Sequence, residues 1–142
     1  MMPIANRAAA LQKNGIRFAL ATTSPTDFDP VEARKSIDRI VALGEPAACL
    51  THFDEVRDIA EVARQLHGWI DRSEKWRDEA AKSSEPIADV TARIQRELRA
   101  AVDADSRSRG LVFGDAEWKV LALDIELNAQ GIAFVADKLR KA

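Results

Sequence analysis

The chain has 142 residues, of which 46% are hydrophobic and 31% charged, a balance typical of a globular protein rather than a disordered or membrane protein. Lys and Arg total 21 and Asp and Glu total 23, so the net charge of −2 gives no electrostatic support for binding nucleic acid or an acidic membrane. The length suits one domain with a sizeable core, and we predict a single domain over residues 1–142.

The compartment is predicted from what the sequence lacks. The first residues, MMPIANRAAALQKNG, contain no continuous apolar segment like that of a secretory signal peptide. No segment approaches the roughly 20 apolar residues that a membrane-spanning helix needs. The lone Cys49 lies in an apolar run and is expected to be a buried, reduced thiol rather than a nucleophile. We therefore expect a cytoplasmic protein that does not associate with membranes.

The first part of the chain leads into an alternating pattern. Residues 1–15 have no clear helix start or stop and are expected to be loosely held. Ile16, Phe18 and Leu20 then alternate with Arg and Ala, and this period of two predicts a strand with one buried face. The strand should end in the sequence TTSPTDFDP, which has the composition of a turn.

A helix and a second strand are predicted next. Asp29 can cap a helix, Pro30 fits its first position, and Gly44-Glu45-Pro46 should end it. The apolar run Ala47–Leu50 follows as a short buried strand. Together these elements predict a strand–helix–strand unit over residues 16–53, in which the helix connects two parallel strands.

Residues 54–142 are predicted to be helical. Apolar residues recur at helical spacing in three segments, which are separated by SSEP at 83–86 and by an expected loop, DADSRSRG, at 103–110. The last helix should begin with Asp115 as its cap. Asn128 lies on the apolar stripe of that helix, so its amide is expected to hydrogen-bond to a neighbouring loop or backbone. The predicted fold class is α+β, mainly α: a short strand–helix–strand unit followed by three long helices.

The two histidines lie in different predicted surroundings. His52, in AACLTHFDEV, stands where the second predicted strand ends, at the edge of such a unit that commonly carries function. Its spacing favours a structural role, because the chain has no histidine four residues away, no CxxC and no HExxH. Asp54, Glu55 and Asp58 could orient its imidazole, or Asp54 could cap the next helix with the others in its first turn. His67, beside the apolar stripe of the first long helix, is expected to have a structural role, either on the helix surface or half-buried.

Two other polar groups are assigned structural roles. The hydroxyl groups of Thr22, Thr23 and Ser24 are expected to form turns after the first strand. The arginines at 93, 96, 99, 107 and 109 are interleaved with acidic residues, which indicates a solvated helix face rather than a track for phosphate groups.

Three separated stretches occur in the order FALATTSPTDFDP, SIDRIVALGEPAACLTHFDEVRDI and LALDIELNAQGIAFV. In this order they make residues 16–139 similar to the C-terminal part of a metallo-β-lactamase-fold hydrolase. The resemblance implies that His52, in the T-H-F element, descends from a ligand of the second metal of a dinuclear site. It also implies zinc or another divalent metal as the cofactor if the remaining ligands come from elsewhere, and otherwise no cofactor.

The family's principal metal-binding motif, His-x-His-x-Asp-His, has no counterpart here, and neither have its later histidine and bridging aspartate. With His52 and His67 alone, the chain cannot assemble a dinuclear site. The resemblance therefore implies the C-terminal half of an αββα sandwich, whose missing half would leave sheet edges and apolar faces uncovered. A homo-oligomer or a partner chain is expected to cover them, and neither nucleic acid nor membrane is expected as a partner.

Three hypotheses for function follow. The first is a truncated or divergent metallo-β-lactamase-fold protein that is not catalytic on its own; any activity it has should be that of a metal-dependent hydrolase. The second is a helical oligomerisation or interaction module, in which Trp69, Trp76, Phe113 and Trp118 lie either at the binding surface or in the core. The third joins the two, with a metal half-site that a partner chain completes.

Overall fold

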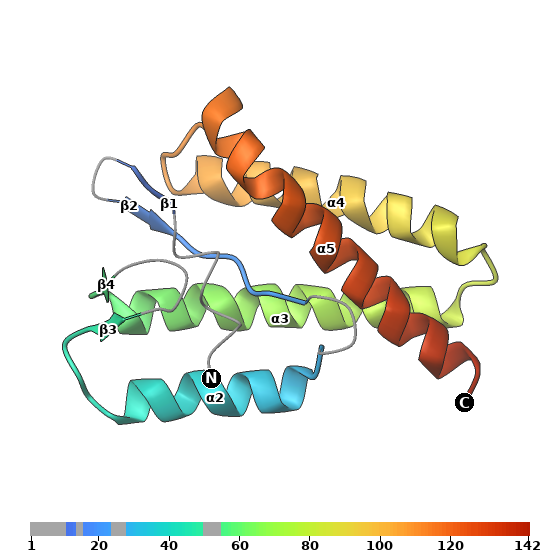
Figure 1. The fold of residues 1–142 in the computed structure, drawn as a ribbon, viewed down its shortest axis with the longest axis horizontal. Helices are drawn as coiled ribbons and strands as arrows, with labels where there is room; N and C mark the ends of the chain where they lie inside the picture. The colour runs from blue at the N-terminus through green and yellow to red at the C-terminus, as the bar shows by residue number, and fades with distance from the viewer. Residues whose placement is uncertain (1–10, 14–15, 24–27, 50–54) are drawn as a thin grey trace. The chain divides into compact units, whose positions relative to one another are not determined.

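The computed structural model describes residues 11–13, 16–23, 28–49 and 55–142. Figure 1 shows the elements in chain order: β1 (Leu11–Lys13), β2 (Ile16–Phe18), α2 (Pro30–Ala42), β3 (Ala48–Cys49), β4 (Glu55–Val56), α3 (Ile59–Lys82), α4 (Ile87–Ser108) and α5 (Asp115–Arg140). This order confirms the predicted fold class, because a strand, a helix and a strand precede three long helices. None of the described helices is long and apolar enough to cross a bilayer.

The described residues fall into two compact units. The first lies within Met1–Thr22 and Asp29–Arg72, and the second within Thr23–Phe28 and Ser73–Ala142. Helix α3 contributes to both, since the division falls inside it. That the whole chain folds as one domain stays a prediction.

The strands form two separate antiparallel pairs. In the first pair Leu11 lies opposite Phe18, and in the second Ala48 lies opposite Val56. The predicted parallel pairing across α2 is therefore wrong for the described strands. Each strand instead bonds to a neighbour close in sequence, because antiparallel strands need only a short connection between them. The predicted single buried face is also wrong, because the described residues that follow one another here are all buried: Phe18, Ala19, Leu20 and Ala21.

Helix α2 begins as the sequence predicts. Its first residue is Pro30, and the Oδ1 atom of Asp29 accepts a hydrogen bond from the N–H of Glu32 at 3.0 Å. This bond satisfies one of the donors that every helix N-terminus exposes. Ala33 and Ile37, one turn apart, are buried on one side of the helix. The chain leaves the helix through Gly44, whose φ of 67° suits a residue without a Cβ.

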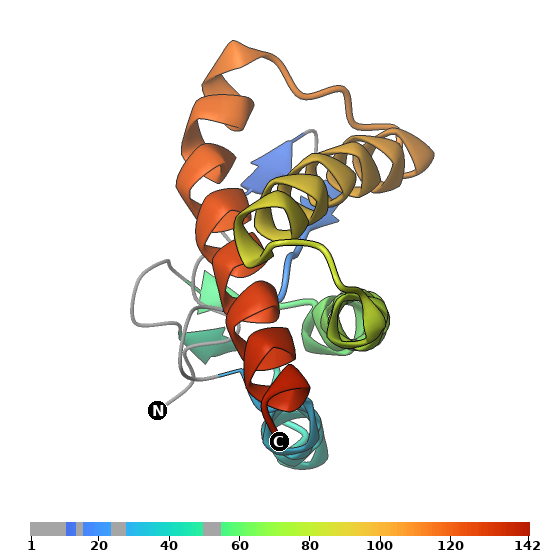
Figure 2. The ribbon, with the colours of Figure 1, turned by 90° about the vertical axis from the view of Figure 1, so that its right-hand side faces the viewer.

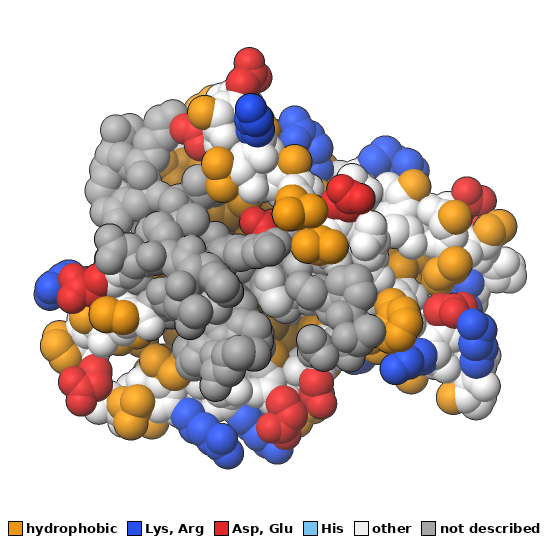
Figure 3. Space-filling model, viewed as in Figure 1, with side chains coloured by type: hydrophobic (Ala, Val, Ile, Leu, Met, Phe, Trp, Pro, Cys, Tyr) orange, Lys and Arg blue, Asp and Glu red, His pale blue; other side chains and the backbone are white. Residues whose placement is uncertain are grey.

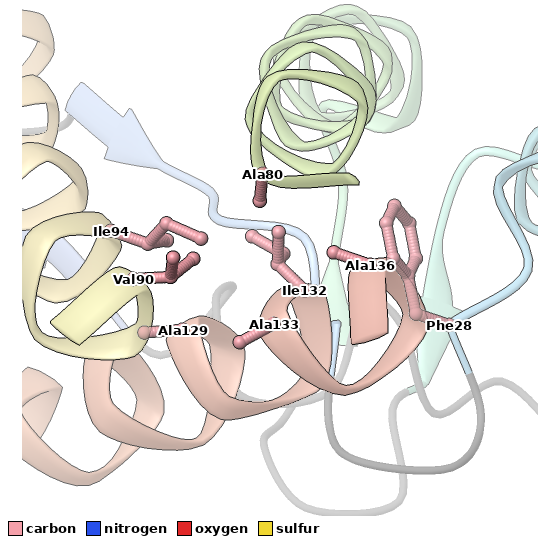
Figure 4. Packing of buried hydrophobic residues seen from close by; sticks show 8 residues of the cluster. All are labelled: Phe28, Ala80, Val90, Ile94, Ala129, Ile132, Ala133 and Ala136. Atoms are coloured by element: carbon pink, nitrogen blue, oxygen red, sulfur yellow. The ribbon is translucent and has the colours of Figure 1, made fainter. Parts of the chain in front are cut away.

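The core of the second unit joins the end of α3 to α4 and α5. Figure 4 shows side chains from these helices pointing toward one another, together with Phe28: Ala80, Val90, Ile94, Ala129, Ile132, Ala133 and Ala136. Four of the eight are alanines, three of them on α5, and their small side chains allow helices to approach closely. Figures 1 and 2 show that α5 crosses α4. Burial of this apolar area is the main favourable contribution to the folding of the unit.

Helix α4 extends further than the sequence indicates. The prediction of a loop over residues 103–110 is wrong for residues 103–108, which belong to the helix up to its end at Ser108. Arg107 pairs with Asp103 at 3.0 Å and Arg109 with Asp105 at 3.0 Å, each four residues apart. Such pairs stabilise a helix whose composition otherwise favours a loop. The helix then ends beside Gly110, at a φ of 79°.

Helix α5 begins one residue earlier than the predicted cap at Asp115 implies. Gly114 is the cap and Asp115 is the first helical residue. The N–H of Gly114 donates to the Oε2 atom of Glu117 at 2.9 Å, so a side chain from the first turn satisfies the backbone donor that precedes the helix.

Candidate functional site

His52, the predicted metal ligand, lies outside the described residues, as does Asp54. The neighbouring strands β3 and β4 are described, and at the end of β3 Cys49 is exposed. The predicted burial of this thiol is therefore wrong. Ala48 pairs with the buried Val56, whereas Cys49 pairs with the exposed Glu55, so Cys49 lies on the outer face of the hairpin.

The described acidic residues near His52 have local roles. Glu55 pairs with Arg57 at 2.9 Å, and Asp58 directly precedes α3, with its carbonyl accepting from the N–H of Val62. Because α3 begins at Ile59, the prediction that Asp54 caps it is wrong. Within the described part of the chain, no three His, Cys, Asp or Glu side chains gather to hold a metal. Metal binding by His52 stays a prediction.

His67 is half-buried, one of the two placements expected, and connects two helices of the first unit. Its Nε2 atom lies 2.9 Å from the Oδ1 atom of Asp38 on α2. One turn away, the Nη2 atom of Arg34 lies 2.5 Å from the Oδ1 atom of Asp71. Since the residues of each helix are four apart and pair in opposite order, α2 and α3 run antiparallel here. This arrangement gives His67 a structural role in the association of the two helices.

Asn128 has the partners that its position predicts. Its Oδ1 atom accepts from the N–H of Thr23 at 2.9 Å, and its backbone carbonyl accepts from the hydroxyl of Thr23 at 2.9 Å. Both residues are buried. Thr23 was expected to form a turn, but its hydroxyl instead binds α5, 105 residues away in sequence. The two bonds fix Thr23 against the middle of the last helix.

The large aromatic residues belong to the core. Trp69 is buried and packs edge to face with Phe18, with 6.3 Å between the ring centroids. Phe113 is buried against the half-buried Trp118, 5.6 Å away. Trp76 packs on the core cluster of the second unit. Of the two roles left open for these residues, core packing is therefore the one that the structure shows.

The arginine series forms a solvated, ion-paired surface, as predicted. Three of its members pair with carboxylates: Arg93 with Glu85 and Glu97, Arg107 with Asp103, and Arg109 with Asp105. The guanidinium of Arg99 lies 4.0 Å from the ring centroid of Trp118, a distance that favours a cation–π interaction.

Helix α5 carries a second apolar face that points away from the core. Its members are separated by three, four or seven residues, which places them on one side of the helix: Ala116, Val120, Leu123, Leu127 and Phe134. We call them the outer face of α5. Val120 is 54% exposed, Leu123 53% and Phe134 37%, and Leu127 is half-buried. Figure 3 shows hydrophobic side chains along the course of this helix.

Charged residues of both signs flank the outer face at its ends. Glu117 and Lys119 lie near its start, and Asp137 and Lys138 near its end. The Nζ atom of Lys138 lies 4.7 Å from the ring centroid of Phe134, so this ammonium group covers part of the exposed ring. The arrangement offers an apolar strip bounded by charges, which is suited to recognition of another helix rather than to chemistry.

The sequence contains the signal for this outer face. Apolar residues at 116, 120, 123, 127 and 134 fit a helical period as well as the buried stripe does. A single sequence does not tell which of two apolar faces a core will cover.

Comparisons with known proteins gave no match: no protein-family model, no curated protein and no solved structure matches the chain. The relationship to metallo-β-lactamase-fold hydrolases therefore rests on the sequence resemblance and stays a prediction.

Replacing Asn128 by Ala should lower the free energy of unfolding by about 1–3 kcal/mol, because the buried N–H of Thr23 loses its acceptor. The measurement is urea denaturation followed by circular dichroism. Gln95→Ala, which removes an exposed amide from α4, is the control and should change the free energy by less than about 0.5 kcal/mol. Equal effects of the two substitutions would contradict the proposed role of Asn128.

Proposed function

We propose that the chain is a cytoplasmic interaction module that binds a protein partner through the outer face of α5. One observation carries this proposal: Leu123 is 53% exposed on a helix whose opposite side forms the core of the second unit. Exposed apolar surface costs roughly 25 cal/mol per Å² relative to burial. A row of such residues on one helix is typical of a surface that a partner covers.

The spacing of the outer face favours a helical partner. Val120, Leu123 and Leu127 follow one another at intervals of three and four residues, and Phe134 comes seven residues later. Helices that pack along their length use this repeat, because side chains of one helix enter the gaps between side chains of the other. The charged residues at both ends of the face would then lie at the rim, where they set partner choice more than affinity.

Site-specific photo-crosslinking in the native cells tests this proposal. A photoreactive residue at Leu123 should give a covalent adduct to a protein, identified by mass spectrometry, because a bound partner lies against that side chain. The same residue at Leu43, an exposed leucine at the end of α2 that is 70% exposed, is the matched control and should give little or no adduct. Equal yields at the two positions would overturn the proposal.

A second candidate is a metallo-β-lactamase-fold relative whose metal half-site is completed by a partner chain. It is supported by the resemblance and by two local features that agree with it. Helix α2 is capped by Asp29 and begins at Pro30, and strand β3 ends at Cys49, three residues before His52. His52 would supply one neutral imidazole ligand to zinc or another divalent metal. A gene directly upstream that encodes His-x-His-x-Asp-His would identify the partner.

The chain alone, loaded with zinc, manganese or iron, should not hydrolyse generic ester, lactam or phosphodiester substrates, because one histidine cannot assemble a dinuclear site. The measurement is the rate with and without chelator, for the wild type, His52→Ala and the control His67→Ala. Hydrolysis that chelation abolishes, and that is lost in His52→Ala but kept in His67→Ala, would contradict this expectation.

A further inference from the structure

We propose that the outer face of α5 is covered by a second copy of this chain, with the two α5 helices antiparallel around a two-fold axis at Leu127. This inference rests on the proposed binding role of the outer face and names its occupant. Two-fold dimers use the same surface on both copies, so the face must be complementary to itself when it is reversed.

The apolar residues of the outer face are arranged symmetrically about Leu127. Val120 precedes Leu127 by seven residues and Phe134 follows it by seven. In an antiparallel pair the two Leu127 side chains would meet at the axis, and each Val120 would lie opposite Phe134 of the second copy. The smaller side chain then faces the larger one, which keeps the distance between the two helices even along their length.

The charges at the ends of the face are also complementary when the helix is reversed. On one edge lie Glu117 and Lys138, ten and eleven residues from Leu127. The reversed copy therefore brings its Lys138 beside Glu117. On the other edge lie Lys119 and Asp137, eight and ten residues from Leu127, so Lys119 comes beside Asp137 of the second copy. The two-fold axis repeats both pairs, which gives four opposite-charge pairs at the rim.

Glu126 is the residue that this arrangement does not favour. It lies next to the axis, so the Glu126 carboxylates of the two copies come close together and repel each other. Within each copy, the Oε1 atom of Glu126 accepts a hydrogen bond from the Nε2 atom of Gln130 at 3.3 Å. A parallel pair would be less favourable, because it brings Glu126 beside Asp124 of the second copy twice. It would also place the two Phe134 rings at one level and the two Val120 side chains at another, which makes the packing uneven. A parallel pair would also bring Glu117 beside Lys119 and Lys138 beside Asp137 of the second copy, so the rim charges fit both directions. The apolar packing and the contacts of Glu126 favour the antiparallel pair.

The size of the face sets the strength of the expected dimer. Its residues from Ala116 to Phe134 span about 27 Å of helix, at 1.5 Å per residue. One helix pair of this length buries less than the roughly 800 Å² per partner of a standard stable interface. The dimer should therefore dissociate reversibly in the micromolar range.

Sedimentation equilibrium of the purified full chain, from about 1 to 500 μM, tests the second copy. The wild type should show a reversible monomer–dimer equilibrium, Leu123→Asp should weaken it at least tenfold, and Leu43→Asp should leave it unchanged. Circular dichroism checks that both variants fold. A wild type that stays monomeric over this range, or a dimer that Leu123→Asp leaves intact, would overturn the proposal.

The two proposals fail in different ways. A monomeric wild type that still crosslinks through position 123 to a different protein in cells overturns the second copy and supports the interaction module. A monomeric wild type with no adduct at position 123 overturns both. Adducts between two copies of the chain at position 123 support both.

Disulfide formation tests the direction of the two helices. In a Cys49→Ser background, a mixture of Glu117→Cys and Lys138→Cys should form the mixed disulfide faster than either variant alone forms its own. The antiparallel pair brings position 117 of one copy close to position 138 of the other. It keeps position 117 far from position 117 of the other copy, and position 138 far from position 138. Faster self-crosslinking of either single variant would overturn the antiparallel arrangement.

Discussion

The second unit depends on the packing of the inner side of α5 against α4 and the end of α3. The inner side supplies Ala129, Ile132, Ala133 and Ala136 to the core cluster, and small side chains at this crossing allow the helices to approach closely. Two polar contacts also hold α5 within this unit. Asn128 binds both backbone and side chain of Thr23, and the guanidinium of Arg140 donates to the carbonyl oxygen of Ala80 at 2.8 Å, near the end of α3. A cation at the C-terminal end of a helix is favourable because the last carbonyl groups have no partners within the helix.

The same helix gives the strongest indication of function. A helix with one apolar face leaves little apolar surface exposed once that face packs on a core. Helix α5 has a further row of apolar residues on its opposite side. The proposed interaction module follows from this surplus. The proposed metal half-site has a different basis, since it depends on His52 and on the order of the sequence stretches. The two proposals concern separate parts of the chain and are compatible, because a protein that needs a partner for its metal site also needs a surface for association.

Features set by neighbouring residues could be predicted from the sequence. The cap of α2 at Asp29, the buried stripe of α4 and the bonded amide of Asn128 all depend on local rules: a capping side chain, a period of 3.6 residues, and the cost of burying an amide without partners. The partner of Asn128 could not be named, because Thr23 lies 105 positions away in the sequence and no local rule links the two residues.

Features that depend on tertiary choice were missed. Each strand could have paired with a distant strand or a nearby one. The short connections between strands that are neighbours in sequence favour the two antiparallel hairpins. Cys49 is exposed because that pairing placed it on the outer side, although the run around it is apolar. The outer face of α5 could not be told from the core face, because two apolar stripes on one helix are equivalent in sequence until a core covers one of them. The expected metal role of His52 concerns residues outside the described part of the chain.

The claim that the two sides of α5 have different roles is tested most directly by comparing Ile132→Ala with Leu123→Ala. The free energy of unfolding is measured in urea at submicromolar concentration, where the chain is expected to be monomeric. Ile132 is fully buried, so its truncation should cost about 2–5 kcal/mol. Leu123 is 53% exposed, so its truncation should cost less than about 0.5 kcal/mol. Equal losses for the two variants would show that the outer face is part of the monomer's core and would contradict this account.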